Sequence, residues 1–130
     1  MREILFRGKR VDDGEWMFGN LTLWGDGGAS IDQEPTEGSP LYAVDTETVG
    51  QFTGLTDKNG KRIFENDIVN IEYPKTTVKN CVIEYMGASF FGSTPTDSWE
   101  LDGYYDIEVI GNIHDNPEIL ERSNEKCRMN

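Results

Sequence analysis

Apolar and polar residues alternate along most of this chain with a period of two, the pattern of β-strands that bury one face. The clearest case is residues 48–72, TVGQFTGLTDKNGKRIFENDIVNIE, where Asn59 and Gly60 separate two alternating runs. Asn-Gly is the strongest short hairpin signal, because a two-residue turn needs positive φ at both positions. The pattern predicts a two-residue hairpin, a sharp turn at residues 65–67 and a third strand over residues 68–73.

The N-terminal part of the chain predicts another hairpin. Residues 4–7 form a short strand, and the turn pair Asp13-Gly14 leads into an alternating run over residues 15–24. One face of that run carries Trp16, Phe18, Asn20, Thr22 and Trp24, and the other carries Met17, Leu21 and Leu23. Because both faces hold large apolar residues, we expect a second sheet or another subunit to cover each face.

Two outcomes for the second face stay open. In the first, copies of the chain associate, because large exposed apolar patches are uncommon on monomers and commonly mark interfaces. In the second, residues 25–44 fold back and bury that face within one chain. Residues 25–40 are rich in Gly, Asp, Ser, Glu and Pro, so we expect a long loop and a boundary there, with Ala29 and Ile31 as isolated apolar residues. Residues 41–44 are the next short strand.

The second half of the chain predicts further strands at residues 78–86 and 107–113. Asn116-Pro117-Glu118 then has the cap, proline and acid of a helix start, which predicts a short C-terminal helical turn. Between the strands lies a Gly-, Ser-, Thr- and Pro-rich segment with a cluster of aromatic residues: Phe90, Phe91, Trp99, Tyr104 and Tyr105. Such aromatics either form a recognition surface or close the end of a barrel, and the sequence leaves both open.

The charge is unevenly distributed over the chain. The net charge is −12; residues 11–57 hold ten acidic residues and no Lys or Arg, and residues 80–121 hold nine acidic residues and none. An acidic surface repels phosphate groups, so direct binding to DNA or RNA is disfavoured. The ordinary interpretation is a soluble protein with solvated acidic faces. The sharper one is an acidic mimic of nucleic acid that binds a basic partner.

Groups able to carry out catalysis are sparse. His114 precedes Asp115, but without a nucleophile or metal partner we expect a surface or capping role for it. Asp57, Glu65 and Asp67 lack the spacing of a calcium loop. We therefore predict that the protein is not an enzyme and has no catalytic, cofactor-binding or metal-binding residues.

The cysteines and the apolar runs bear on location. Cys81 and Cys127 lie far apart, which fits reduced thiols in a cytosol. No run reaches the roughly 20 apolar residues of a membrane span, and the short apolar core near the N-terminus does not predict a signal peptide.

Three segments spread over almost the whole chain carry a family resemblance. They are MREILFRGKRVDDGEWMFG at residues 1–19, QFTGLTDKNGKRIFENDIV at residues 51–69 and VIGNIHDNPEILE at residues 109–121. In this order they resemble the YopX family, small proteins of tailed bacteriophages and prophages. Asn66 stands where Gly is expected, and Asn best tolerates the left-handed conformation after Gly. The resemblance implies a mostly β protein with an SH3-like barrel, no established activity and no catalytic residues.

Together these observations predict a mostly β fold with an SH3-like barrel, an additional N-terminal β-hairpin or sheet and a short C-terminal helical turn. The expected domains are residues 1–47, the hairpin region with its acidic loop; residues 48–121, the barrel, with strands from 48 to 113; and residues 122–130, a polar tail. We expect a cytoplasmic phage or prophage protein that acts through contacts with itself or with a phage or host protein. An SH3-like module with a nucleic-acid-related role is the alternative. The candidate interaction surface comprises Trp16, Phe18, Leu21, Trp24, Trp99, Tyr104 and Tyr105.

Overall fold

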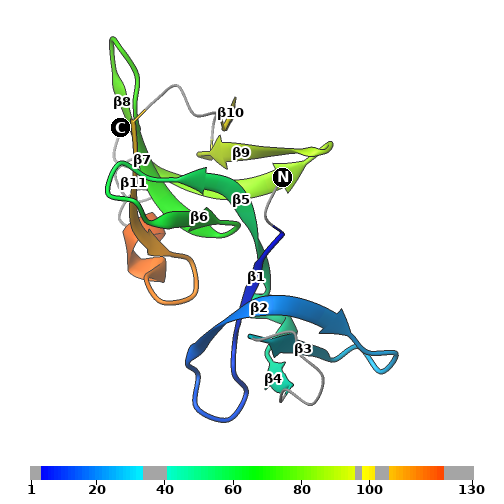
Figure 1. Ribbon diagram of the computed structural model, residues 1–130. Coiled ribbons are helices and arrows are strands. Elements are labelled where there is room, and N and C mark those ends of the chain that lie inside the picture. The colour runs from blue at the N-terminus through cyan, green and yellow to red at the C-terminus, as the bar shows by residue number, and fades with distance from the viewer. Residues whose placement is uncertain (1–3, 34–40, 96–97, 102–105, 122–130) are drawn as a thin grey trace. The chain divides into compact units, whose positions relative to one another are not determined.

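The computed structural model describes residues 4–33, 41–95, 98–101 and 106–121, and most of these lie in β-strands (Figure 1). The chain divides into two compact units, which we call the N-terminal unit (Met1–Gly54) and the C-terminal unit (Leu55–Asn130). The prediction of a mostly β protein is confirmed, as is the short helical turn, which covers residues 117–121.

The strands follow one another closely along the chain. They are β1 (Phe6–Lys9), β2 (Trp16–Leu23), β3 (Ala29–Asp32), β4 (Tyr42–Val44), β5 (Gly50–Thr56), β6 (Arg62–Phe64), β7 (Asp67–Glu72), β8 (Thr77–Met86), β9 (Ser89–Ser93), β10 (Ser98–Glu100) and β11 (Asp106–Asn112), with the 3-10 turn η1 (Thr46–Thr48) before β5.

The N-terminal unit is built from antiparallel neighbours whose pairing returns to its start. β1 pairs with β2, β2 with β3 and β3 with β4. The residues after β1 then pair with β4, through a bridge between Arg10 and Val44 and a hydrogen bond of 3.1 Å from Val11 N to Ala43 O. The four strands form a hydrogen-bonded circuit around a small core of Met17, Ala29, Ile31 and Val44, against which Leu21, Tyr42 and Val49 pack.

The expectation of one long loop over residues 25–40 is wrong where β3 forms. Ala29 and Ile31 are not isolated apolar residues, because they are two positions apart and both point into the core, where Ile31 is fully buried. Two apolar side chains are enough for a four-residue strand whose backbone is hydrogen-bonded on both edges. Folding back within one chain therefore buries the Met17 face of β2, as the second of the two outcomes predicted.

The C-terminal unit contains a five-stranded antiparallel sheet with the order β10-β9-β8-β7-β11. Its core comprises Ile63, Val69, Ile71, Cys81, Ile83, Phe90 and Ile107. Among the described strands this sheet is open, since β10 and β11 end it, so the expected closed barrel over residues 48–113 is not observed. One physical reason is that the first residues of β5 pair with β1, through Arg7 and Gly50 among others, and are not available to a barrel formed by the later strands.

The hairpin at Asn59-Gly60 is present, but its loop is not the expected two-residue type. Gly60 has φ of +82°, whereas Asn59 does not have positive φ. Gly60 N donates to Asp57 O at 3.0 Å and Asp57 N donates to Lys61 O at 2.7 Å, the pattern of a three-residue loop that ends in a left-handed glycine. A two-residue turn with positive φ at both positions occurs instead at Gly87 (+54°) and Ala88 (+74°), between β8 and β9.

Candidate functional site

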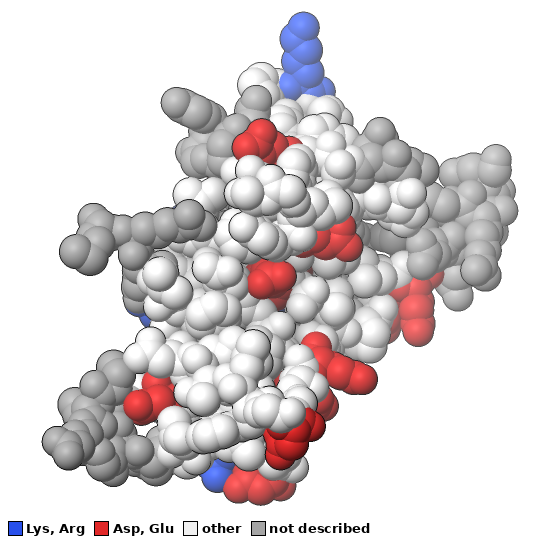
Figure 2. All heavy atoms as spheres, turned by 90° about the vertical axis from the view of Figure 1, so that its right-hand side faces the viewer, with Lys and Arg blue, Asp and Glu red and all other residues white. Residues whose placement is uncertain are grey.

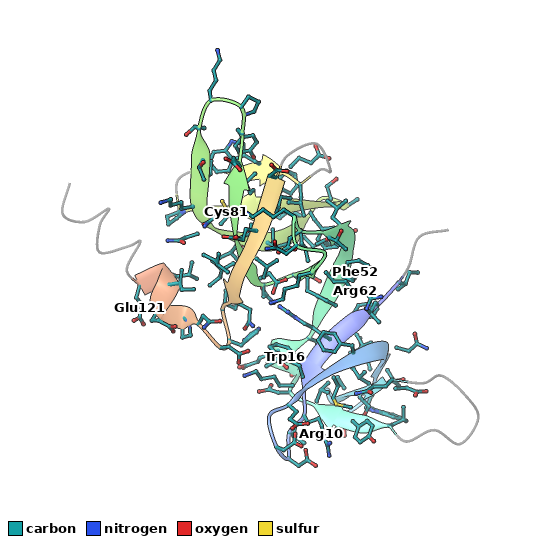
Figure 3. The ribbon with its side chains drawn as sticks, turned by 60° about the vertical axis from the view of Figure 1, so that its left-hand side comes forward. Arg10, Trp16, Phe52, Arg62, Cys81 and Glu121 are labelled. Atoms are coloured by element: carbon teal, nitrogen blue, oxygen red, sulfur yellow. The ribbon has the colours of Figure 1, made fainter. Side chains whose placement is uncertain are left out.

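One face of β2 presents aromatic side chains outward. Phe18 is 42% exposed and Trp24, directly after the strand, is 48% exposed. Trp16, labelled at the start of β2 in Figure 3, is half-buried. Met17, which points to the other side, lies in the core. The sequence therefore assigned Trp16, Phe18 and Trp24 to one face correctly, and we call these three residues the aromatic stripe.

Two cationic side chains from β1 lie against Trp16. The register pairs Lys9 with Trp16 and Arg7 with Phe18, so all four residues share one face. Arg7 Cζ lies 4.6 Å from the centroid of the Trp16 ring and Lys9 Nζ lies 5.3 Å from it. Cations at this distance from an indole ring are attracted to its π face. Sequence reasoning missed these contacts, because they depend on the strand register.

Trp24 is held in a fixed orientation at the other end of the stripe. Its indole Nε1 donates a hydrogen bond of 2.9 Å to Ser30 Oγ on β3. Its backbone N donates to Gly28 O at 2.8 Å and its carbonyl accepts from Gly27 N at 3.1 Å, which closes the β2–β3 turn. An aromatic side chain that is already ordered loses little conformational entropy when a partner covers it.

Acidic residues accompany the Trp24 half of the stripe. Asp26 lies exposed in the turn after Trp24, where its Oδ1 accepts from Gly28 N at 2.8 Å. Asp32 on β3 pairs with Asn20, halfway between Trp16 and Trp24, and so shares the face of the stripe. By register, the charged residues on this face are the bases Arg7 and Lys9 and the acid Asp32, whereas Asp26 lines a hollow that Lys9 also borders.

The other predicted surface residues are not part of this face. Leu21 points to the opposite side of β2, where it is partly buried and packs against the core of the N-terminal unit. Trp99 on β10 packs against the core of the C-terminal unit, with its ring centroid 6.3 Å from that of Tyr73. The predicted residues Tyr104 and Tyr105 lie outside the described residues.

A hollow of about 610 Å³ lies at one end of the N-terminal unit, between Arg10, Asp26 and Asp45. Its most strongly basic residue is already engaged within the unit. Arg10 donates to Asp12 Oδ2 at 2.7 Å, which lowers the pKa of that carboxyl, and its Cζ lies 4.7 Å from the centroid of the Tyr42 ring. The guanidinium of Arg10 is therefore already paired within the unit, and Lys9 also lines the hollow.

Acidic side chains are scattered over the face drawn in Figure 2, with Lys and Arg only at its margins. In the C-terminal unit, Asp106 lies directly opposite Glu72 on the neighbouring strand, and the nearby Glu108 is 3.4 Å from Lys58 Nζ. Like charges placed opposite each other on adjacent strands are unfavourable. The acidic surface that the composition predicts therefore includes β7 and β11 in this sheet.

The resemblance seen in the sequence can now be set against known proteins. A family model described as YopX protein matches residues 6–121. The chain belongs to the YopX family. No curated protein matches it. Among solved structures, the crystal structure of protein EF1440 from Enterococcus faecalis is similar at 25% sequence identity and a TM-score of 0.46, covering 92% of this chain and 99% of that one.

In this YopX protein, the acidic residue of the DKNG segment has a structural role. Asp57 Oδ1 accepts from Asn59 N and from Lys61 N, both at 2.9 Å, and Oδ2 accepts from Val109 N at 3.0 Å. Burial raises the pKa of this carboxyl, but the three backbone hydrogen bonds outweigh burial and the net pKa is lowered. Asp57 is thus an ionised group that joins the hairpin loop to β11, and its carboxylate is fully occupied.

The GNIHDNP segment of the YopX signature also forms a hydrogen-bonded turn. Asn112 Oδ1 accepts from His114 N at 3.0 Å and from Asp115 N at 2.9 Å, and its Nδ2 donates to Asp115 Oδ2 at 3.1 Å. Asn116 Oδ1 accepts from Asn112 N at 3.2 Å, so Asn116 caps this turn as well as preceding the helical turn. Asn66 has φ of +70°, which confirms that it takes the left-handed conformation.

Asp67 and Cys81 are also parts of the fold. Asp67 is buried and its Oδ2 accepts from Phe64 N at 2.8 Å. Cys81 is fully buried, and burial raises the pKa of its thiol to about 11, which leaves it protonated near neutral pH. Within the described ranges, no three His, Cys, Asp or Glu residues are grouped to hold a metal ion, and no helix is long and apolar enough to cross a membrane.

Proposed function

We propose that this YopX protein works through protein–protein contacts without catalysis, and that it associates with itself through the aromatic stripe. The observation that carries this proposal is the exposure of Phe18 and Trp24 on one face of β2. Aromatic residues are enriched among the side chains that dominate the energy of protein interfaces. The hydrogen bond from Trp24 to Ser30 orients one of them before a partner arrives.

The charge on this face favours a second copy of the chain as the partner. Two molecules that each carry a net charge of −12 repel each other, and they meet with least repulsion where the surface is locally neutral. The stripe is such a place, because its face carries the bases Arg7 and Lys9 as well as the acid Asp32. A basic partner would be attracted more strongly to the acidic faces elsewhere, and a nucleic acid would be repelled by the whole molecule.

The size of the stripe predicts a weak interface. From Trp16 to Trp24 the segment is roughly 26 Å long. Because β1 pairs with residues 16–19 and β3 with residues 20–23, two strands lie side by side at any point, a width of roughly 10 Å. The resulting area of roughly 260 Å² is about a third of the roughly 800 Å² that each partner buries in a standard interface. We therefore expect association in the micromolar range.

A role without catalysis is supported by the way the reactive groups are used. The carboxylate of Asp57 is saturated by backbone donors, and the thiol of Cys81 is buried and protonated. A setting in tailed bacteriophages or prophages, a location in the bacterial cytoplasm and an SH3-like character of the C-terminal unit belong to the same proposal. They are supported by the resemblance of the three signature segments.

Sedimentation equilibrium over micromolar concentrations tests the proposal. We expect the apparent mass of the wild type to rise above 14.7 kDa as its concentration increases. The apparent mass of Phe18→Glu should stay at 14.7 kDa. The matched control is Leu23→Glu, because Leu23 is 72% exposed on the other face of the same strand and its replacement should leave association unchanged. A wild-type mass of 14.7 kDa throughout would overturn the proposal. A gel shift with DNA or RNA at low salt would instead support the nucleic-acid-related alternative.

A further inference from the structure

We infer that the C-terminal unit binds a lysine side chain of a protein partner, in a pocket on the face of β8 and β9 that points away from the core. The pocket has a volume of about 250 Å³, and Val82, Glu84, Ser93, Pro95 and Leu120 are among the residues that line it. This inference goes beyond the proposed self-association, because the pocket and the aromatic stripe belong to different units.

The strand register determines which side chains reach the pocket. Ile83 points into the core, so Val82 and Glu84, its neighbours on β8, point to the other face. Val82 lies directly opposite Ser93 on β9. The helical turn adds Leu120, which is partly buried. Two strands and the helical turn therefore form the pocket together.

The apolar part of the pocket fits an aliphatic stem. Val82, Pro95 and Leu120 have side chains made of carbon alone, and each is partly or fully exposed to solvent. A lysine side chain has a flexible four-carbon stem, which can lie on apolar surface while its charged end stays among polar groups.

Two polar groups of the pocket fit the ammonium group at the end of that stem. Glu84 and Ser93 are diagonal neighbours across the β8–β9 pair, roughly 7–8 Å apart, a separation that long side chains span. Ser93 Oγ is buried and has no hydrogen-bond partner among the described residues. A buried hydroxyl without a partner is unfavourable, so a donor that reaches it from the pocket is stabilised. An ammonium group has three donors and can bond both side chains, whereas the planar fork of arginine suits a single bidentate carboxylate.

The charge around the pocket favours a cation as its occupant. The lining residues named above all lie within residues 80–121, the stretch with nine acidic residues and no Lys or Arg. A surface of one sign attracts ligands of the opposite sign and repels those of its own. A basic protein is therefore a better partner for this pocket than a nucleic acid or an acidic protein.

An NMR titration of the full chain with the blocked tripeptide Gly-Lys-Gly tests the pocket. We expect saturable shifts of the amide signals of Val82, Ser93 and Leu120. The same peptide with norleucine keeps an aliphatic stem without the ammonium group, and it should bind about fivefold more weakly. The peptide Gly-Glu-Gly should leave these signals unshifted.

Two substitutions test the polar groups. Glu84→Gln should raise the dissociation constant of the lysine peptide about fivefold, because the amide keeps the size of the carboxylate but not its charge. Glu100→Gln is the matched control, since it makes the same change on an exposed residue of β10. Ser93→Ala should raise the dissociation constant about threefold without lowering the melting temperature, because its hydroxyl has no partner to lose in the unbound protein.

Saturable binding that prefers lysine and weakens in Glu84→Gln but not in Glu100→Gln supports the proposal. Shifts that do not saturate, equal binding of the norleucine and lysine peptides, or binding unchanged in both Glu84→Gln and Ser93→Ala would overturn it. The chain itself has Arg122, Lys126 and Arg128 after the helical turn. If replacing all three by Ser tightens binding of the lysine peptide, the chain's own basic residues compete for the pocket, which would overturn a partner as its occupant.

Discussion

Asp57 Oδ2 accepts a hydrogen bond of 3.0 Å from the backbone N–H of Val109, which lies 52 residues further along the chain. The other oxygen of the same carboxylate closes the loop at residues 58–60. One side chain therefore fixes both the shape of a hairpin loop and its attachment to β11. In the DKNG segment, an acid two positions before Asn59 is typical of a turn, and the contact to β11 shows why its charge matters as well.

Replacing Asp57 by Asn should destabilise the protein by roughly 1–3 kcal/mol at neutral pH, because an amide NH₂ cannot accept from a backbone N–H. The folded-state pKa is lowered, so this stabilisation is fully present above the unfolded-state pKa of about 3.9 and is lost as the pH falls through the folded-state pKa. Urea unfolding from pH 7 to pH 3 measures it. The difference in the free energy of unfolding between wild type and variant should narrow below about pH 4. Glu84→Gln, exposed on β8, is the control and should have the same free energy of unfolding as the wild type at neutral pH.

Replacing Ala88 by Gly should stabilise the protein by up to about 1 kcal/mol, because a residue with a Cβ is strained at a φ of +74°. The urea midpoint measures the change. Ala43→Gly on β4 is the control and should have the opposite sign, since Ala43 does not have positive φ and glycine there only adds freedom to the unfolded chain. An equal loss of stability in Ala88→Gly and Ala43→Gly would contradict the strain at Ala88.

Replacing Gly60 by Val should cost about 1–3 kcal/mol through its φ of +82°, since nothing lies within 4 Å of an added Cβ and a clash is not involved. Gly60→Asn should recover most of this loss, because Asn tolerates the left-handed region. Gly25→Val is the matched control: its Cβ also meets open space, without positive φ. If thermal melts show the same loss for Gly25→Val, the conformational explanation fails.

Replacing Trp24 by Phe should weaken self-association roughly three- to tenfold, because an aromatic ring remains but the hydrogen bond to Ser30 does not. Ser30→Ala removes the same bond from the other side. In the double variant, self-association measured by sedimentation equilibrium should therefore be weakened no more than in the more strongly affected single variant. Additive losses would mean that the bond does not orient Trp24 for binding.

The sequence predicted local features well where a few neighbouring residues decide them. The hairpin at Asn59-Gly60, the left-handed Asn66 and the shared face of Trp16, Phe18 and Trp24 follow from turn chemistry and alternation. The loop type at Gly60 did not follow, because the Asp57 carboxylate holds the residues before Gly60 in a different turn. Strand β3 was missed, because two apolar residues give too short a pattern to distinguish a strand from a loop.

Features that depend on pairing between distant strands could not be predicted. A closed barrel was expected over residues 48–113, but the start of β5 pairs with β1, and the periodicity of β5 does not reveal which neighbour it takes. The cations on Trp16 likewise depend on register, since Arg7 and Lys9 reach that ring only because β1 and β2 pair as they do. The sequence left open whether Trp99 forms a recognition surface or closes the end of a barrel, because its flanking segment is polar; the side chain packs against the core of the C-terminal unit.

The return of β4 to the end of β1 limits how this protein can join others. Each of the strands β1 to β4 has a hydrogen-bonded neighbour along both of its edges, at least in part, because β1 is flanked by β2 on one side and by β5 and β4 on the other. Such edges offer little backbone for an added strand, the usual route to fibrils and to domain-swapped aggregates. Assembly through this unit is then left to side chains, and it should dissolve on dilution instead of growing into a continuous sheet.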